Sequence, residues 1–214
     1  MNSITSGSPI RGLYAITPEC ASTSELIRKV AAALAGGVKV IQYRQKNQSA
    51  DNQALQAHEL NKLCSAQNAL LIINDNIALA IRIDAAGVHL GRDDVGLTEA
   101  RGLLGKQKII GISCYDQMPL AETAVSAGAD YIAFGAFFSS AVKPHAVRAD
   151  LAMIRTAKKK FSVPIVAIGG ISLQNAAALL SAGADAVAVI SDLFNAPDIT
   201  AHAFAFQQLF AEKT

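Results

Sequence analysis

Eight short, almost continuously hydrophobic segments recur along the chain at intervals of about 25 residues. Their apolar residues follow one another without regular polar alternation, which is typical of parallel strands that are buried on both faces. The pattern therefore predicts eight parallel strands, at Gly12–Thr17, Val38–Tyr43, Leu70–Asn74, Gly87–Leu90, Ile109–Cys114, Tyr131–Phe137, Pro164–Ile168 and Ala186–Ile190.

Segments with helical periodicity separate most of the predicted strands. Shorter helices are expected after Asn76 and after Leu97. Several helices are predicted to end at a glycine C-cap that leads into the next strand, at Gly36, Gly128 and Gly183. The longer predicted helices are Ser24–Leu34, Ala50–Gln67, Leu151–Lys160, Leu173–Ala182 and Ala201–Phe210.

The regular alternation of strands and helices predicts an α/β protein, a single (β/α)₈ TIM barrel over residues 1–214. Residues 1–10 are expected to form a flexible N-terminal extension. A doubly wound open sheet is the main competitor, and for dinucleotides it carries a glycine-rich G-x-G-x-x-G turn after its first strand. Here that strand ends in Ile16-Thr17-Pro18-Glu19, which favours the barrel.

Composition narrows the class of partner. The net charge of +2 is too small to indicate nucleic acid or an anionic membrane, and no apolar stretch approaches the roughly 20 residues of a membrane span. Three scattered cysteines do not predict a disulfide framework, and residues 1–10 lack the pattern of a signal peptide. We therefore expect a cytoplasmic protein whose partners are neither nucleic acid nor a membrane; the sequence leaves the oligomeric state open.

Charged and polar residues follow the predicted strands where each strand ends. Arg44 and Lys46 lie at alternate positions after the second strand, so both side chains can point into the same mouth. A guanidinium and an ammonium together suit a phosphate or diphosphate, although a solvated strand end is an equally good explanation for this pair alone. Catalytic groups of barrels lie beyond the carboxyl ends of the strands, so the pattern indicates an enzyme that acts on charged, phosphorylated small molecules.

Two carboxylates add a possible metal site. Asp75 follows the third strand and Asp94 follows the fourth, so the two are expected to be neighbours. Carboxylates beside phosphate-binding cations are suitable ligands for Mg²⁺, which uses few protein oxygens and completes its shell with substrate phosphates. The alternative is helix capping, by Asp75 near Asn76 and by Asp93 or Asp94 near Leu97.

The remaining strand ends carry groups of less specific chemistry. His89 lies within its strand and is expected to be a core or supporting residue, and Cys114 is expected to be structural because nothing in the sequence activates its thiol. Ser113 could donate a hydrogen bond into the mouth. Gly169-Gly170 and Ser191 follow the last two strands, where barrels commonly bind phosphate through backbone N–H groups and a helix start.

Five motifs, in their order along the chain, resemble the thiamine phosphate synthase family. The resemblance extends from Tyr14 to about Pro197 and rests on the combination of motifs more than on any one of them. The motifs are Gln42-Tyr43-Arg44-Gln45-Lys46, Ile73-Asn74-Asp75, Gly87-Val88-His89-Leu90-Gly91-Arg92-Asp93-Asp94, Ala167-Ile168-Gly169-Gly170-Ile171 and Ala188-Val189-Ile190-Ser191.

The resemblance implies a Mg²⁺-dependent transferase that joins hydroxymethylpyrimidine diphosphate to hydroxyethylthiazole phosphate and releases diphosphate. In that family Arg44, Lys46 and Lys143 would be the catalytic cations, and Asp75 and Asp94 would hold Mg²⁺. The pyrimidine diphosphate would contact Gln42, Arg44, Lys46, Asn74, Ser113 and Lys143. The thiazole phosphate would contact Ser140, Ala141, Val142, Gly170, Ile190 and Ser191.

The sequence departs from the family pattern around the sixth strand and in two neighbouring motifs. Gly135-Ala136-Phe137-Phe138-Ser139-Ser140 replaces Gly-Pro-Ile-Phe-Pro-Thr, and Val142-Lys143 replaces Thr-Lys. Arg92 stands where glutamine is common, and Cys114-Tyr115-Asp116 is also atypical. Two alternatives therefore stay open, namely a thiazole tautomerase-like relative and a protein that binds thiamine phosphate or thiazole phosphate without turnover.

Overall fold

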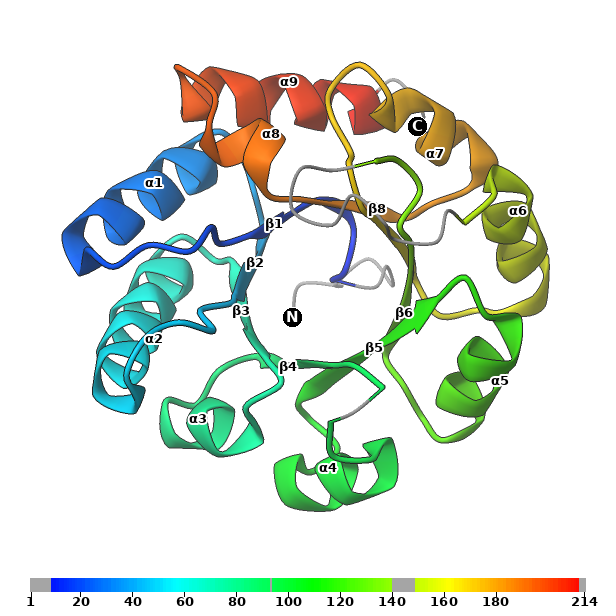
Figure 1. Ribbon diagram of the computed structural model, residues 1–214, viewed down its shortest axis with the longest axis horizontal. Coiled ribbons are helices and arrows are strands. Elements are labelled where there is room, and N and C mark those ends of the chain that lie inside the picture. The colour runs from blue at the N-terminus through cyan, green and yellow to red at the C-terminus, as the bar shows by residue number, and fades with distance from the viewer. Residues whose placement is uncertain (1–8, 93, 140–148, 212–214) are drawn as a thin grey trace, which may run out of the picture.

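Eight parallel strands close into a barrel in the computed structural model, which describes residues 9–92, 94–139 and 149–211 (Figure 1). Each strand pairs with the next, and β8 pairs back with β1 through Tyr14 opposite Ala188. The predicted (β/α)₈ TIM barrel is confirmed. The strands are β1 Gly12–Ile16, β2 Val40–Tyr43, β3 Leu70–Asn74, β4 Gly87–Leu90, β5 Ile109–Tyr115, β6 Tyr131–Phe134, β7 Ile165–Ile168 and β8 Ala186–Val189.

Helices surround the barrel on its outside (Figure 1). The helix predicted from Leu173 begins three residues later, at Ala176, because a turn occupies the intervening residues. The hydrophobic pattern did not single out α5 or α8, and α8 has only four residues, too few to show a periodicity. The helices are α1 Thr23–Ala35, α2 Ala50–Ala66, α3 Ile77–Arg82, α4 Leu97–Leu104, α5 Met118–Ser126, α6 Leu151–Lys160, α7 Ala176–Ala182, α8 Ser191–Phe194 and α9 Ile199–Ala211.

Glycines end several helices much as predicted. Gly183 is the C-cap of α7, and Gly128 follows Ala127, the C-cap of α5; both glycines have left-handed backbones, with φ of 114° and 90°. After α1 the left-handed residue is Gly37, with φ of 94°, and Gly36 is the C-cap with an ordinary φ of −79°. None of the helices in the described parts of the chain has the length and apolar character that crossing a bilayer requires.

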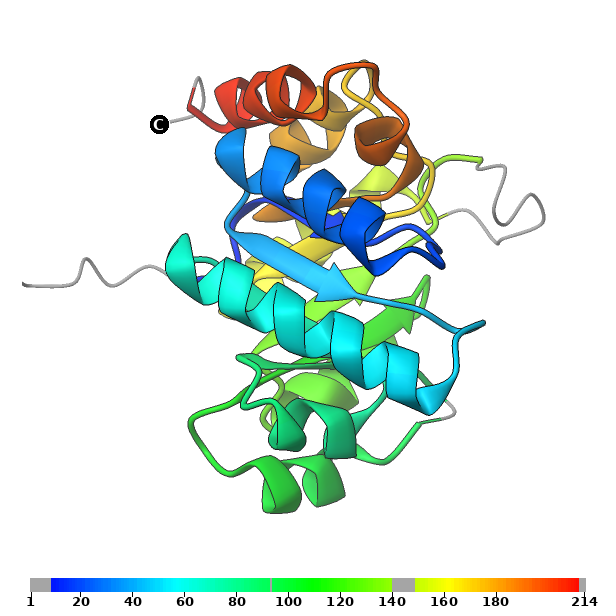
Figure 2. The same ribbon diagram turned by 90° about the vertical axis from the view of Figure 1, so that its left-hand side faces the viewer.

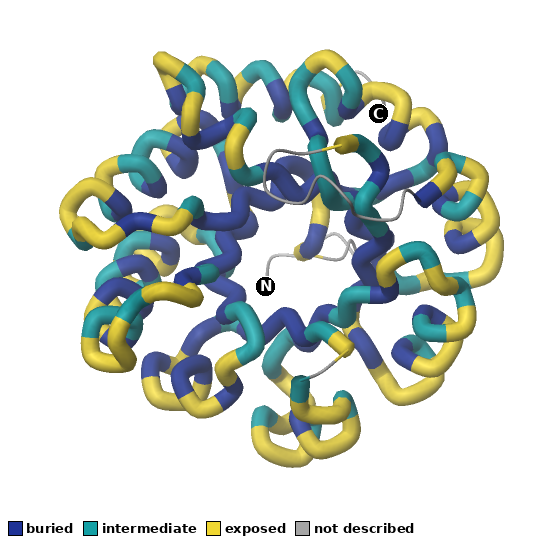
Figure 3. The backbone as a smooth tube through the Cα atoms, viewed as in Figure 1, coloured by how far each residue is buried: buried dark blue, intermediate teal, exposed yellow. Residues whose placement is uncertain are grey.

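Buried side chains form two separate clusters, one inside the barrel and one between the strands and the helices. The strands are buried almost throughout, whereas the helices expose their outer faces (Figure 3). The inner cluster includes two tyrosines, Tyr14 and Tyr131, among aliphatic side chains. Ile10, from the predicted N-terminal extension, is 1% exposed and belongs to this cluster, whereas residues 1–8 lie outside the described residues.

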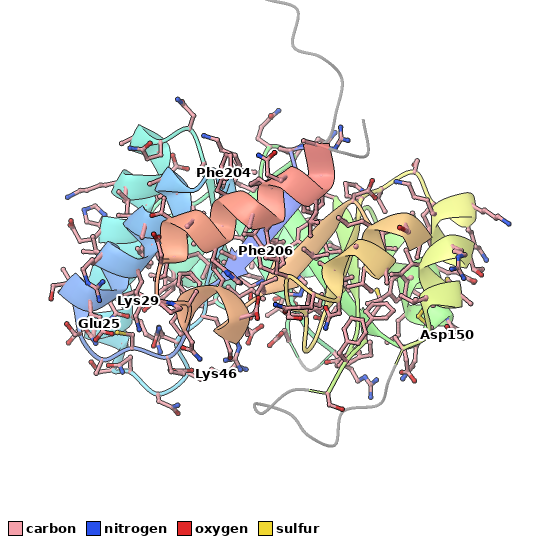
Figure 4. All side chains as sticks on the ribbon, turned by 90° about the horizontal axis from the view of Figure 1, so that it is seen from above. Glu25, Lys29, Lys46, Asp150, Phe204 and Phe206 are labelled. Atoms are coloured by element: carbon pink, nitrogen blue, oxygen red, sulfur yellow. The ribbon has the colours of Figure 1, made fainter. Side chains whose placement is uncertain are left out.

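The carboxyl ends of the strands share one end of the barrel, as the side view shows for β2 (Figure 2). Lys46, which follows β2, lies at that end, whereas Phe204 and Phe206 lie on α9 along the side of the barrel (Figure 4). The polar residues that follow the strands therefore meet at a common mouth, which is where a barrel enzyme places its active site.

Candidate active site

The loop after β2 is fixed from the end of β1. The backbone N–H of Arg44 donates to Thr17 Oγ1 at 2.9 Å, and the backbone N–H of Lys46 donates to Glu19 Oε1 at 3.0 Å. Arg44 Nη1 lies 3.7 Å from the same carboxylate oxygen. Gln42, which precedes this loop, points into the barrel and is 3% exposed. Sequence reasoning missed Glu19, although its carboxylate contacts the backbone of Lys46 and the guanidinium of Arg44.

Two carboxylates and a lysine meet beyond β3 and β4. Lys46 Nζ lies 3.1 Å from Asp75 Oδ2. Burial, with the nearby carboxylate of Asp94, raises the pKa of Asp75 above the ordinary aspartate value, and Lys46 opposes this rise only in part. The two predicted metal ligands are therefore neighbours whose negative charges repel each other.

Helix capping does not explain either of these carboxylates. The N-cap of α3 is Asn76, whose side chain accepts from the N–H of Leu79 at 2.9 Å, and Asp75 has a left-handed backbone with φ of 61°. The N-cap of α4 is Gly96, which makes no side-chain cap. Asp94 Oδ2 instead accepts from the N–H of Gly91 at 2.6 Å, while Asp93 lies outside the described residues.

The carboxylate pair fits a divalent cation of the Mg²⁺ type. Its mutual repulsion is the kind that a bound cation relieves, and Mg²⁺ typically takes one or two carboxylates together with substrate phosphate oxygens. Among residues 9–92, 94–139 and 149–211, no group of three or more His, Cys, Asp or Glu side chains gathers to form a complete protein cage. The donor set is therefore suited to a metal that is shared with a phosphorylated substrate.

Neutral polar side chains line the next part of the mouth. Asn74 ends β3 and lies opposite His89 of β4, whose Nε2 is 2.8 Å from Ser113 Oγ of β5. Burial lowers the pKa of His89 to about 4, so the ring is neutral at physiological pH. Burial also raises the pKa of Cys114 to about 12, so its thiol is protonated and unreactive, consistent with the predicted structural role.

The loop after β7 forms a narrow backbone turn. Gly169 and Gly170 have left-handed backbones, with φ of 101° and 63°. A Cβ atom at Gly170 would lie 2.4 Å from the carbonyl oxygen of Ser139, and the N–H of Phe138 donates to the carbonyl of Gly169 at 3.0 Å. The segment after β6 therefore packs directly on the glycine pair, and β6 itself ends at Phe134, three residues before the predicted Phe137.

The short helix α8 is joined to the loop after β7. Asp192 Oδ2 accepts from the N–H of Leu173 at 3.1 Å and lies 2.7 Å from His202 Nε2 of α9. Ile190 is the N-cap of α8 and Ser191 is its first residue. The sequence predicts a phosphate site at this glycine turn and helix start, where backbone N–H groups would hold the anion.

Two departures from the family pattern are in contact with each other. The guanidinium carbon of Arg92 lies 4.7 Å from the ring centroid of Tyr115, within the range of a cation–π interaction. Tyr115 is the last residue of β5, has a left-handed backbone with φ of 54°, and is 37% exposed. The two atypical residues thus form one pair at the mouth.

The structure brings together ten of the predicted site residues at the mouth. They are Gln42, Arg44, Lys46, Asn74, Asp75, Asp94, Ser113, Gly170, Ile190 and Ser191. The other four, Ser140, Ala141, Val142 and Lys143, lie outside the described residues.

Comparison of the chain with known proteins identifies its family. A sequence profile described as thiamine monophosphate synthase matches residues 13–193. The chain belongs to this family. It is 54% identical over 202 residues to the thiamine-phosphate synthase of Methylobacillus flagellatus, covering 94% of this chain and 96% of the relative. It is 49% identical over 200 residues to the thiamine-phosphate synthase of Thiobacillus denitrificans, covering 94% and 95%.

A solved structure of the family has the same fold. The thiamine phosphate pyrophosphorylase from Pyrococcus furiosus superimposes with a TM-score of 0.85 at 30% identity, covering 96% of this chain and 97% of that chain. The predicted family and the predicted class of enzyme, a transferase of thiamine biosynthesis, are thereby confirmed. Enzymes of this family act on phosphorylated precursors of thiamine, in agreement with the predicted small-molecule partners.

Proposed function

We propose that this member of the family joins hydroxymethylpyrimidine diphosphate to hydroxyethylthiazole phosphate, giving thiamine phosphate and diphosphate, with Mg²⁺ as its cofactor. One observation carries the proposal: Asp75 and Asp94 adjoin each other while Lys46 lies 3.1 Å from Asp75. This is the arrangement of charges that a metal–diphosphate group requires. A tautomerase-like relative or a binding protein for thiazole phosphate alone would have no use for it.

The proposed site divides between two substrates. The pyrimidine diphosphate contacts residues that follow β2, β3 and β5, together with one residue of the segment after β6. These are Gln42, Arg44, Lys46, Asn74, Ser113 and Lys143. The thiazole phosphate contacts that segment and the ends of β7 and β8, at Ser140, Ala141, Val142, Gly170, Ile190 and Ser191.

The reaction breaks the bond between the pyrimidine methylene and the diphosphate oxygen, and the bonding electrons leave with diphosphate. Arg44, Lys46 and Lys143 stabilise the negative charge that develops on that group. Mg²⁺, held by Asp75 and Asp94, supplies further neutralisation of that charge when it is bound. The aminopyrimidine stabilises the methylene cation, and the thiazole nitrogen donates its lone pair to form the new C–N bond.

No nucleophile or general base is needed from the protein in this scheme. The side chains bind, orient and neutralise, which agrees with a protonated Cys114 thiol and a neutral, buried His89. Three free, buried cysteines support the prediction that the enzyme works in the cytoplasm.

The decisive experiment is an assay of diphosphate release by the purified protein, with each substrate alone and with both, in the presence and absence of Mg²⁺. We expect release only when both substrates and the metal are present. No release under any of these conditions, together with retained binding of thiazole phosphate, would instead support the tautomerase-like or binding alternatives.

A further inference from the structure

A continuous line of hydrogen bonds crosses the interior of the barrel beneath the mouth. We call it the interior network, and its members are Gln42, Tyr14, Tyr131, His89 and Ser113. Gln42 Nε2 donates to the Tyr14 hydroxyl at 3.0 Å, and the two tyrosine hydroxyls lie 2.8 Å apart. The Tyr131 hydroxyl lies 2.9 Å from His89 Nδ1, and His89 Nε2 lies 2.8 Å from Ser113 Oγ. The network links β2 to β5 through β1, β6 and β4.

The surrounding packing holds this network in place. Tyr14 and Tyr131 are at most 1% exposed, and the rings of His89 and Tyr131 stack with centroids 5.5 Å apart. Gly111 of β5 leaves the space that the Tyr131 ring occupies, since a Cβ atom there would lie 1.9 Å from the ring carbon that carries the hydroxyl. A polar line built through an otherwise apolar core is costly unless every member is hydrogen-bonded, as it is here.

The network has a direction because each internal link has one hydrogen to share. The Tyr14 hydroxyl accepts from Gln42, so the one arrangement that gives every hydrogen of the line an acceptor sends the Tyr14 hydrogen to Tyr131. In this arrangement Tyr131 donates to His89 Nδ1, and the neutral ring carries its hydrogen on Nε2 and donates it to Ser113. Two groups remain that the network does not use: the amide oxygen of Gln42 and the hydroxyl hydrogen of Ser113.

We propose that the interior network sets the hydrogen-bond polarity of the mouth, with Gln42 as an acceptor and Ser113 as a donor, and that Tyr14, Tyr131 and His89 are positioning residues for the pyrimidine. This inference rests on the proposed function for its substrate. An aminopyrimidine carries an amino group that donates and ring nitrogens that accept. Its binding site therefore requires one hydrogen-bond acceptor and one donor in fixed places. If the hydrogen bonds of the network ran in the opposite direction, Gln42 would present a donor to the pyrimidine and Ser113 an acceptor.

The direction is tested first without any substrate, by ¹⁵N NMR of the histidine side chains, with His89→Gln used to assign the signals. The expected result is a neutral His89 with its proton on Nε2. A neutral ring with its proton on Nδ1 would overturn the proposed direction. This measurement is independent of catalysis, so it stays informative even if the protein releases no diphosphate.

The positioning role is tested by steady-state kinetics of Tyr131→Phe, Ser113→Ala and the double variant. We expect Tyr131→Phe to raise KM for the pyrimidine diphosphate roughly tenfold, the effect of about one hydrogen bond, and to leave KM for the thiazole phosphate unchanged. The double variant should be no worse than the worse single variant, because Tyr131 acts through Ser113. Full additivity, or an unchanged KM, would refute the role.

Tyr43→Phe is the matched control. The Tyr43 hydroxyl is also buried and donates to a side-chain amide, Gln56 Oε1 at 3.0 Å, but it lies between β2 and α2, outside the barrel. We expect this variant to lose stability while it keeps both KM values.

If Tyr131→Phe does not fold, Tyr14→Phe breaks the same network one link away and is expected to raise the same KM for the pyrimidine diphosphate.

Discussion

The two halves of the barrel mouth present polar groups of different kinds. The charged half, after β2 to β4, consists of the side chains of Arg44, Lys46, Asp75 and Asp94. The backbone half, after β7 and β8, consists of the Gly169-Gly170 turn and the start of α8. Charges on side chains can be removed one at a time, whereas backbone N–H groups are disturbed only by changes that move the chain. The two halves should therefore respond to different substitutions.

The largest effect is expected in the charged half. If Asp75 holds Mg²⁺ as proposed, Asp75→Asn should lower kcat for diphosphate release by roughly 10²–10³-fold, because it would remove a ligand of the ion that stabilises the departing charge. The matched control is Asp84→Asn, which alters an aspartate between α3 and β4 that pairs with Lys108. Near-normal turnover of Asp75→Asn, measured at saturating Mg²⁺ and both substrates, would remove Asp75 from the metal site.

A smaller effect, confined to one substrate, is expected in the backbone half. Gly170→Ala adds a Cβ atom that would lie 2.4 Å from the Ser139 carbonyl oxygen, at a backbone φ of 63°. Local strain of about 1–3 kcal/mol should raise KM for the thiazole phosphate roughly 10–100-fold. Gly102→Ala is the control, since a Cβ there meets nothing within 4 Å in helix α4. A rise in KM for the pyrimidine diphosphate alone would contradict the division of the mouth.

A still smaller effect is expected when a side chain of the backbone half is shortened. Ser191→Ala removes a hydroxyl but keeps the N–H groups at the start of α8. A neutral hydrogen bond contributes about 0.5–1.5 kcal/mol, so KM for the thiazole phosphate should rise by less than roughly tenfold. If Ser191→Ala were more damaging than Gly170→Ala in the same assay, side chains would dominate both halves.

The smallest expected change concerns thermal stability. The Asp75→Asn variant, which should lose activity, should gain stability. The folded-state pKa of Asp75 is raised, so its favourable contribution to folding is present at acid pH and is lost as pH rises through that pKa. Asp75→Asn should therefore raise Tm of the metal-free protein near pH 7, by about 2–4 °C per kcal/mol, with the gain disappearing in acid. Thermal unfolding at several pH values checks this, and a lower Tm at pH 7 would contradict the repulsion between the carboxylates.

The sequence was informative where local pattern decides structure. Continuous apolar runs located all eight strands, and charged residues directly after β2, β3 and β4 located the charged half. Glycines placed the ends of the helices and the turn after β7 because their backbone freedom is a local property. These features depend on residues that are near one another in the chain.

Contacts between distant segments could not be predicted in this way. Glu19 orders the loop that carries Arg44 and Lys46, yet its own neighbourhood in sequence gives no sign of that partner. Tyr14 and Tyr131 are 117 positions apart and meet only because β1 and β6 both contribute to the barrel interior. Arg92 and Tyr115 looked like two separate departures until the fold placed one against the other.

The left-handed backbone of Asp75 also limits how this enzyme can change during evolution. Aspartate and asparagine tolerate a φ of 61°, whereas longer and β-branched side chains are strained there. A glutamate here would combine a displaced carboxylate with an unfavourable backbone, so the common exchange of aspartate for glutamate is disfavoured at this position. Asparagine is the one residue that fits the backbone and nearly matches the shape while losing the charge. If Asp75 holds the metal as proposed, Asp75→Asn is the single substitution that would remove this ligand with the least disturbance of the fold.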